Sequence, residues 1–327
     1  MSFCLGFDAG YSNLKTVMGE SGKKPVSRLR PSGAGPASKM PTHMSSGSED
    51  TGVRVSIDGE PWVAGVHAGY LEGWVRTLDA NYPDSDNYLA LYYAALLQTG
   101  RNVVDRVVTG LPVSQYQEFE RRDRLVQRLV GHHKINSSTV VEVKEVIVLP
   151  QPVGAYMNLL SYTDDLELME EGRVVVLDPG FFSFDWVAMQ GRSLRKESSG
   201  TSQQAMSRLL EESSRLIVGQ FGAGACTAEK LESAIRSGRD KVLVFGQRVE
   251  FKPFMRDAMP LVSGQAMAAL KQSMREESAN GADIVLLAGG GAESYMEAAK
   301  EAFPRSKVVV AKNPVMANAE GFWFYGS

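Results

Sequence analysis

The sequence predicts an α/β protein built from two related halves. Apolar, strand-like runs alternate along the chain with segments whose apolar residues recur at helical spacing, which is the pattern of α/β folds. Residues 3–10 and 173–180 each run an apolar strand into an Asp-x-Gly turn, so that one half repeats the start of the other. The length of 327 residues suits about two domains.

Composition narrows the class of protein further. Apolar residues make up 43% and charged residues 22%, as in ordinary globular proteins and unlike disordered or fibrous ones. The formal net charge of −3 provides no general attraction to nucleic acid, so any link to DNA is expected to be local or indirect. The sequence has no apolar run of about 18 residues and no secretory leader pattern, which predicts a cytoplasmic protein without a membrane partner.

Cysteine and histidine offer no metal site. Cys4 and Cys226 are too few and too far apart for a disulfide framework or a zinc cluster, and we expect both to be reduced. The histidines lack ligand spacing with those cysteines and are expected on the surface or in loops. They are His43, His67, His132 and His133.

The first half begins with two predicted hairpins. The strand that ends at Asp8 is followed by a second strand over residues 14–18, across a turn of residues 10–13. Residues 21–51 are rich in Gly, Ser, Pro and Lys and predict an extended loop or partly ordered insertion. Residues 53–64 alternate around Asp-Gly, which indicates a second hairpin in a small β subdomain of about residues 21–85.

Alternating helices and strands complete this half. The expected elements are a helix over 85–99, a strand over 106–111, a helix over 114–130, a strand over 141–149 and a helix over 153–160. The polar stretch 163–172 separates the halves. We therefore predict domain I at 1–165, domain II at 166–312 and a C-terminal helix, 313–327, that returns to domain I.

The second half repeats the opening hairpin with strands at 174–177 and 184–189. Helices are expected at 202–221, 228–237 and 254–278. A buried strand over 284–288 leads into three glycines and a helix over 292–302, followed by a strand over 307–311 and the closing helix.

The two Asp-x-Gly turns are the first chemical signal. A turn can offer N–H groups to phosphate oxygens, and Lys15, five residues beyond Gly10, supplies a positive charge. In the second turn Asp178 and Asp185 are the kind of opposed carboxylates that bind Mg²⁺ together with phosphate. Two such turns that face each other would hold a nucleotide triphosphate from both sides. Taken separately, each also fits an ordinary hairpin with a capping aspartate.

Two further sites carry chemistry. The triplet Gly289-Gly290-Gly291 follows a buried strand and precedes a helix, where missing side chains allow a nucleotide to approach the backbone; a tight turn is the alternative. Gln151 lies between two prolines, which would fix its backbone so that its amide orients an attacking water. A surface loop glutamine is the alternative there.

These motifs together resemble the actin superfamily of ATPases, and within it the ParM/StbA plasmid-segregation proteins. Residues 8–15 are similar to the first phosphate loop, 178–185 to the second and 286–293 to the adenosine motif. The similarity continues in family order through 109–113, 150–156 and 318–321. The resemblance implies an actin-like fold, in which two large ribonuclease-H-like domains with smaller subdomains flank a nucleotide cleft.

The resemblance also implies roles for individual residues. Asp8 and Asp178 would arrange hydrated Mg²⁺, and Gln151 would position the hydrolytic water. The residues implied to bind phosphate are Gly10, Tyr11, Ser12, Asn13, Lys15, Gly180, Phe181, Phe182 and Ser183. Those implied to bind adenosine are Gly200, Glu229, Lys230, Gly289, Gly290, Gly291 and Ala292, with Ser199 and Thr201 beside Gly200.

The function that the resemblance implies is a Mg-dependent ATPase that forms nucleotide-dependent filaments. Such a bacterial, cytoplasmic filament would segregate plasmid DNA through a DNA-binding adaptor bound at centromere-like DNA. The alternatives are a small-molecule kinase of the same superfamily and a nucleotide-binding scaffold with little hydrolysis. One departure bears on hydrolysis: Pro179 removes an N–H donor, and Phe181-Phe182 replace smaller family residues.

Overall fold

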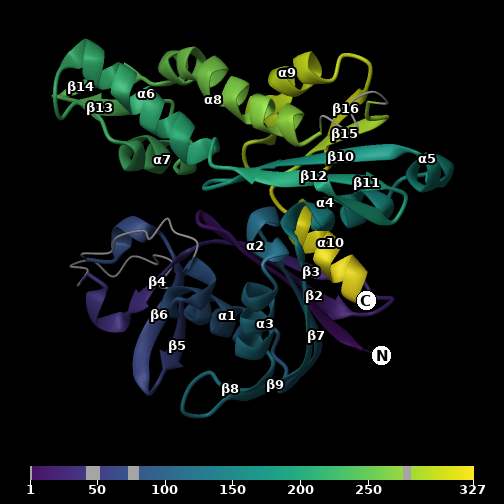
Figure 1. Ribbon diagram of the computed structural model, residues 1–327. Coiled ribbons are helices and arrows are strands. Elements are labelled where there is room, and N and C mark those ends of the chain that lie inside the picture. The colour runs from purple at the N-terminus through teal and green to yellow at the C-terminus, as the bar shows by residue number, and fades with distance from the viewer. Residues whose placement is uncertain (1, 42–51, 73–80, 275–280) are drawn as a thin grey trace. The chain divides into compact units, whose positions relative to one another are not determined.

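The computed structural model describes residues 2–41, 52–72, 81–274 and 281–327 of the chain. The chain forms two compact units, unit 1 (Met1–Leu166 with Ala311–Ser327) and unit 2 (Glu167–Val310). Each unit contains a mixed sheet covered by helices (Figure 1). The predicted α/β class is thereby confirmed.

Unit 1 is organised around a sheet whose central strands are parallel. β1 pairs antiparallel with β2 and parallel with β7, which in turn pairs parallel with β9. The carboxyl ends of β1, β7 and β9 therefore lie along one edge of this sheet. The strands in spatial order are β3 (Val26–Pro31), β2 (Asn13–Glu20), β1 (Phe3–Ala9), β7 (Val103–Leu111), β9 (Val140–Pro150) and β8 (Gly131–Lys134).

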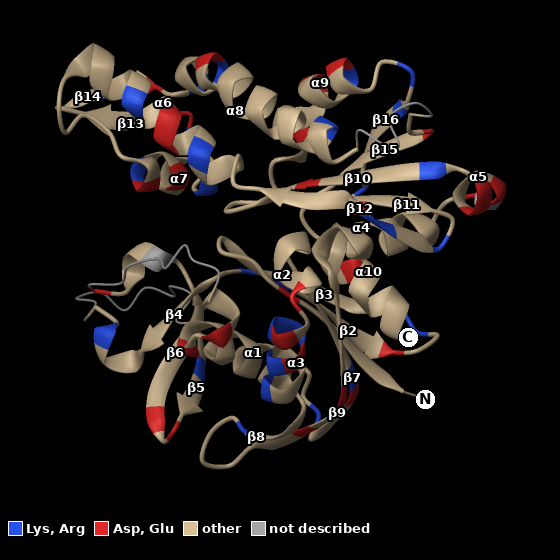
Figure 2. Ribbon diagram, in the orientation of Figure 1, with Lys and Arg blue, Asp and Glu red and all other residues tan. Residues whose placement is uncertain are grey.

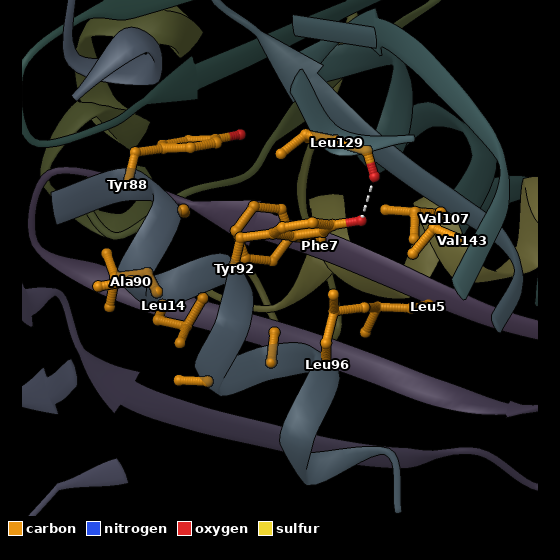
Figure 3. Close-up of a cluster of buried hydrophobic side chains, with 14 of the residues drawn as sticks. Leu5, Phe7, Leu14, Tyr88, Ala90, Tyr92, Leu96, Val107, Leu129 and Val143 are labelled. Carbon is orange, nitrogen blue, oxygen red and sulfur yellow. Dashed lines mark hydrogen bonds between the residues drawn. The ribbon is translucent and has the colours of Figure 1, made fainter. Parts of the chain in front are cut away.

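Residues of β1 alternate between the two faces of the sheet, as the period of a strand requires. Leu5 and Phe7 are buried in a large cluster with helices α1 (Asp86–Gln98) and α3 (Phe119–Leu129), as Figure 3 shows. Cys4 contributes instead to a cluster with Phe322 of helix α10 (Ala317–Gly326) on the other face. The sheet of unit 1 is thus buried on both sides.

Helix α10 packs closely on helix α4 (Gln151–Leu160) because glycines remove side chains from the contact. A Cβ at Gly321 would collide with the carbonyl of Gly154, and a Cβ at Gly154 would lie 2.6 Å from the carbonyl oxygen of Asn318. The side chain of Asn158 donates to Glu320 across the same pair of helices, at 2.9 Å. The segment after unit 2 is therefore an integral part of unit 1.

A small antiparallel sheet and several short helices complete unit 1. The small sheet has the order β4 (Gly33–Pro36), β6 (Glu60–Val66), β5 (Val53–Ile57), and α1 packs against it. Helix α2 (Val113–Gln117) precedes α3. The 3₁₀ turns are η1 (Ala37–Lys39), η2 (Ala68–Tyr70) and η3 (Tyr82–Asp84).

Unit 2 repeats the arrangement of the central strands. β10 pairs antiparallel with β11 and parallel with β15, so the first hairpin of each unit joins its sheet in the same way. The strands in spatial order are β12 (Ser193–Ser202), β11 (Phe184–Gln190), β10 (Arg173–Pro179), β15 (Ile284–Leu287) and β16 (Lys307–Val310). The helices are α5 (Leu166–Glu171), α6 (Met206–Phe221), α7 (Ala228–Arg236), α8 (Lys252–Ser273) and α9 (Ala292–Ala302).

The apolar residues of unit 2 form two cores. One lies between the sheet and helices α8 and α9, where Phe184 stacks on Tyr295 with ring centroids 5.2 Å apart. The other, which we call the outer cluster, joins α6, α7 and the hairpin of β13 (Lys241–Val244) and β14 (Gln247–Glu250). Charges of both signs mix on α6 and α7 (Figure 2), and several pair within a helix, as Arg236 does with Glu232 at 3.0 Å.

Several predicted elements were wrong. Residues 21–51, expected as an extended loop or a partly ordered insertion, contain β3, β4 and η1, so the extended loop was wrong, while residues 42–51 lie outside the described residues. β3 is mostly exposed, with no alternation of buried and exposed residues. Its sequence therefore lacks the alternation of apolar and polar side chains that marks a strand with one buried face. The helix expected over 114–130 is broken at Glu118, whose backbone is extended, into α2 and α3.

Other differences fall in the second half and at its start. The expected polar linker 163–172 contains α5, and the helix expected from residue 202 begins at Met206 because β12 precedes it. Helix α8 ends at Ser273, and residues 275–278 of its expected range lie outside the described residues. The hairpin of β13 and β14 and the strand β8 were not predicted; their short strands are largely exposed.

His133 also differs from its expected place on the surface. It is buried on β8, its Nε2 lies 2.9 Å from the carbonyl oxygen of Leu129, and its ring meets Tyr92 edge-on. Burial lowers the pKa of this imidazole. The neighbouring His132 is exposed because successive residues of a strand point to opposite faces.

Both cysteines are free and buried, in agreement with the expectation of reduced thiols. Burial raises the pKa of the Cys4 thiol to about 12, so this thiol stays protonated at neutral pH. Within the described ranges, no helix is long and apolar enough to cross a membrane.

Candidate functional site

The first aspartate turn, residues 8–15, joins β1 to β2. Asp8 lies directly opposite Lys15 in the hairpin register, and Lys15 Nζ is 2.8 Å from Asp8 Oδ2. The Gly10 N–H donates to the Asn13 carbonyl at 3.0 Å, which closes the turn. The Asp8 side chain is only 1% exposed and that of Lys15 14%, so this ion pair lies largely out of solvent.

Gln151 lies at the same sheet edge as Asp8. It follows β9 directly and is the first residue of α4, with Pro150 as the N-cap residue. Two strand spacings separate β9 from β1, a distance of about 10 Å. Gln151 packs on Gly110 of β7, where a Cβ would lie 2.8 Å from its Cγ. Gln151 is thus held at the start of a helix between Pro150 and Pro152, and the water-positioning role of its side chain stays a prediction.

The second aspartate turn, residues 178–185, has the corresponding place in unit 2. Asp178 lies opposite Asp185 in the hairpin of β10 and β11. The Gly180 N–H donates to the carbonyls of Asp178 and Ser183, both at 2.9 Å. The turn in turn supports helix α6, because the Gly180 and Phe181 carbonyls accept from the first N–H groups of that helix, at 3.2 and 2.8 Å.

Asp185 is held by two hydroxyl groups. Ser183 Oγ donates to its Oδ2 at 2.5 Å, and Thr201 Oγ1 donates to its Oδ1 at 2.6 Å. Sequence reasoning missed the bond from Thr201, because it depends on the register of β12 against β11, and β12 was not predicted. The side chain of Asp185 is thus fixed beside Asp178, on the same face of the hairpin.

The glycine triplet lies against the second aspartate turn. Ala288 N–H donates to Leu177 O, and Gly291 N–H donates to Pro179 O, both at 2.9 Å. Gly289 has a φ of +77°, and a Cβ there would collide with Asp178 Oδ1. Two motifs that are more than a hundred residues apart in the sequence therefore form one surface of unit 2.

The other residues of the triplet differ from Gly289. Gly290 is exposed, and a Cβ there would have no neighbouring heavy atom within 4 Å. Gly291 is the N-cap of α9, and a Cβ there would lie 2.8 Å from the Pro179 carbonyl oxygen. Ala292 is buried in the core beneath α9, so its side chain packs within the protein. Gly290 therefore leaves open backbone beside the N-terminus of α9.

The remaining adenosine candidates have different surroundings. Gly200 lies opposite Trp186, and a Cβ there would come within 2.6 Å of the Trp186 ring, so packing alone accounts for glycine. Glu229 and Lys230 are exposed in the first turn of α7, whose N-cap Thr227 accepts from the Lys230 N–H at 3.3 Å. Ser199 Oγ accepts from Ala188 N–H and donates to Arg195 O within the sheet.

The aromatic residues of the second turn are half-buried. Phe181 packs on the outer cluster formed by α6, α7 and the β13–β14 hairpin, and Phe182 is next to it in the turn. Pro179 has no N–H to offer, but its carbonyl accepts from Gly291. The bulk of Phe181 is therefore accommodated by the packing of unit 2.

The described residues contain no group of three or more His, Cys, Asp or Glu side chains that could enclose a metal ion. Asp178 and Asp185 nevertheless form a pair of neighbouring buried carboxylates. Mg²⁺ is commonly bound through one or two carboxylates, water and substrate phosphate rather than by a complete protein cage. The residues present fit such an ion when it arrives with phosphate.

Comparison with solved structures identifies the fold. The chain resembles an ADP complex of Ta0583, an archaeal actin homologue, with a TM-score of 0.74 and 18% identity, over 99% of this chain and 98% of that one. It resembles a non-polymerisable quadruple mutant of pCBH ParM with a TM-score of 0.76 and 18% identity, over 100% and 99% of the two chains. The chain has an actin-like fold.

Sequence comparison agrees with this actin-like assignment. Residues 6–154 match the family described as the N-terminal domain of actin like proteins. Comparison with curated protein sequences gave no match. The subunit of a 15-stranded ParM filament from Clostridium botulinum is also similar, with a TM-score of 0.74 and 17% identity over 99% of each chain. The predicted resemblance to actin-like and ParM proteins is confirmed, and the roles of the individual residues remain predictions.

Proposed function

We propose that this actin-like protein is a Mg-dependent ATPase that forms filaments when it binds nucleotide. The observation that carries the proposal is the repeated aspartate turn, one on the sheet of each unit, joined to the sheet by the same strand arrangement. In unit 1 the turn shares its sheet edge with Gln151, and in unit 2 it lies against the glycine triplet. Each turn is proposed to bind nucleotide phosphate.

Backbone donors and Lys15 would bind the phosphates. Lys15 is paired with Asp8 at 2.8 Å, and its three N–H donors allow it to contact a phosphate oxygen as well. The N–H groups of residues 11–13 and 181–183 are the other candidate donors, since those of Gly10 and Gly180 close the turns themselves. The open backbone at Gly290 and the N-terminus of α9 would approach the adenosine.

Asp8 and Asp178 are the proposed ligands of Mg²⁺, through water. When bound, the ion would neutralise charge on the phosphates. Gln151 would orient the attacking water with its amide, a role that needs a fixed backbone and no proton transfer to the side chain. The contact between Gln151 and Gly110 supports that role.

Nucleotide-dependent polymerisation follows from the same proposal. A ligand that favours one conformation of the subunit shifts the population toward it, and a head-to-tail contact that does not close generates a filament. The filament would position plasmid DNA through a DNA-binding adaptor at centromere-like DNA. An indirect link to DNA suits a net charge of −3.

The test is pelleting and light scattering of the purified protein with ATP, ADP, a non-hydrolysable ATP analogue and no nucleotide, with phosphate release measured in parallel. We expect polymer with ATP that decays as phosphate is released. Gln151→Ala should bind ATP and polymerise but release phosphate about 100-fold more slowly, because the attacking water loses the side chain that positions it. No sedimenting polymer across nucleotides and salts would contradict the proposal.

The same measurements separate the alternatives. Phosphate transfer that requires an added sugar or acid, without polymer, would indicate a small-molecule kinase. Tight nucleotide binding with neither turnover nor polymer would indicate a scaffold.

A further inference from the structure

Each aspartate turn carries an aromatic residue directly after its glycine, at equivalent positions. These residues are Tyr11, after Gly10, and Phe181, after Gly180. Both rings pack on other parts of their own unit. Tyr11 stacks on Tyr82, and Phe181 packs on the outer cluster of α6, α7 and the β13–β14 hairpin.

The contact of Tyr11 with Tyr82 is defined by a specific ring geometry, whereas Phe181 packs on several residues of the outer cluster. The rings of Tyr11 and Tyr82 have centroids 4.6 Å apart and an interplanar angle of 29°, which is a stacked pair. Tyr82 is 8% exposed and belongs to η3, some seventy residues from the turn in sequence. Its carbonyl accepts from Ser85 Oγ at 2.7 Å, and Ser85 is the N-cap of α1. Tyr82 is therefore fixed by the start of a helix.

The stack continues into the core of unit 1. Tyr82 meets Tyr88 edge-on with centroids 5.5 Å apart, and Tyr88 meets Phe7 edge-on at 5.5 Å. Phe7 is the residue directly before Asp8 on β1. A continuous set of ring contacts thus connects the turn, through η3 and α1, with the strand that carries Asp8.

We infer that Tyr82 is a positioning residue for the first aspartate turn, and that it acts by holding the ring of Tyr11. This inference rests on the proposed function, since the turn is positioned for a nucleotide. With its ring held by Tyr82, the partly buried side chain of Tyr11 stays packed against the apolar cluster of unit 1, and the backbone of the turn is held with it. Phe181 has the corresponding place in unit 2, with its apolar ring held by the outer cluster.

The variants are chosen around the stacked pair. Tyr82→Leu removes the stacking partner and keeps an apolar side chain, while Tyr82→Phe keeps the ring. Tyr93→Leu is the control, because Tyr93 packs against the same apolar cluster that contains Tyr82, but on the part of α1 that meets His133. Melting temperatures of the three variants establish that they are compared as folded proteins.

Hydrogen exchange of nucleotide-free protein, read on peptides that cover residues 9–14, tests the anchoring itself. We expect Tyr82→Leu to raise the exchange rate of these amides by about 3- to 10-fold, the range to which a stacked aromatic pair converts. Tyr82→Phe and Tyr93→Leu should leave the rate near that of the parent protein. An unchanged rate in Tyr82→Leu, or an equal rise in Tyr93→Leu, overturns the inference.

ADP affinity in Mg²⁺, measured by calorimetry on the same proteins, tests the consequence. We expect Tyr82→Leu to weaken ADP binding by about 3- to 10-fold, with Tyr82→Phe restoring it. Faster exchange with unchanged ADP affinity overturns the positioning role and leaves the proposed function intact. A parent protein that binds neither ADP nor ATP overturns the proposed function, whatever the exchange rates show.

Discussion

Gly289 and Gly290 are neighbours in the sequence with opposite surroundings. Gly289 has a φ of +77° and faces Asp178, whereas Gly290 is exposed with open space around it. Gly289→Ala should lower the free energy of unfolding by about 1–3 kcal/mol through backbone strain and the collision with Asp178. Chemical denaturation measures this change.

Gly290→Ala is the control for that substitution. It should alter the free energy of unfolding by less than about 0.5 kcal/mol, as surface substitutions usually do. If this alanine instead weakens ATP binding without a change in stability, the bound nucleotide lies close to Gly290. Equal destabilisation by both alanines would contradict the geometry of the triplet.

His133 gives the protein a predictable response to acid. Burial lowers the pKa of His133 in the folded state, so the unfolded chain binds more protons as the pH falls below about 6.5. The stability that depends on neutral His133 is complete above that pH and is lost as the pH falls toward the lowered pKa. The melting temperature between pH 7.5 and 5 should therefore fall less in His133→Phe than in the parent protein.

The neighbouring exposed histidine is the control in this case. His132→Asn should retain the parent's dependence of melting temperature on pH. An equal fall of the melting temperature in the parent protein and in His133→Phe would contradict a lowered pKa of His133 in the folded state.

Two glycines within helices have different roles, one in a close helix–helix contact and the other on an exposed helix surface where only helix propensity matters. Gly321 of α10 has no room for a Cβ against Gly154, whereas Gly264 of α8 is exposed with no neighbour within 4 Å. Gly321→Ala should destabilise by about 2 kcal/mol or more, through overpacking. Gly264→Ala should stabilise by about 0.5–1 kcal/mol, because alanine is the better helix former. Urea unfolding midpoints of the two variants should move in opposite directions.

Elements with a buried, continuous apolar run could be predicted from the sequence. β1 and β10 are such strands, and each is followed by a readable turn. β12 and β3 could not, because their polar and exposed residues owe their strand conformation to one paired neighbour. The break at Glu118 was equally hidden, since the charged residues around it are good helix formers.

The same distinction applies to the candidate site. Asp8, Asp178 and the glycine triplet are marked by local sequence, so the sequence alone proposes them as site residues. The bond from Thr201 to Asp185 and the stack of Tyr82 on Tyr11 join residues that are distant in sequence. No local pattern encodes a register between distant strands or a contact between distant rings.

Nucleotide should stabilise the whole molecule. A ligand that binds only the folded state adds free energy of about 2.7 kcal/mol at one hundred times its dissociation constant. Mg-ADP at that concentration should therefore raise the melting temperature by several degrees, by about 2–4 °C per kcal/mol for larger domains. Removal of magnesium with a chelator should reduce the rise, and Asp178→Asn should reduce the difference that magnesium makes. An equal rise with and without magnesium would contradict the proposed metal site.

The return of the chain to unit 1 after residue 310 sets an order for biosynthesis. Strand β1 leaves the ribosome before unit 2, but Phe322, which covers Cys4 and Val108, is translated only after all of unit 2. Unit 2 is continuous in sequence, so it can acquire its complete fold during translation. Until residues 311–327 are translated, part of one apolar face of the unit 1 sheet stays uncovered. We expect molecular chaperones to bind the nascent chain at that face.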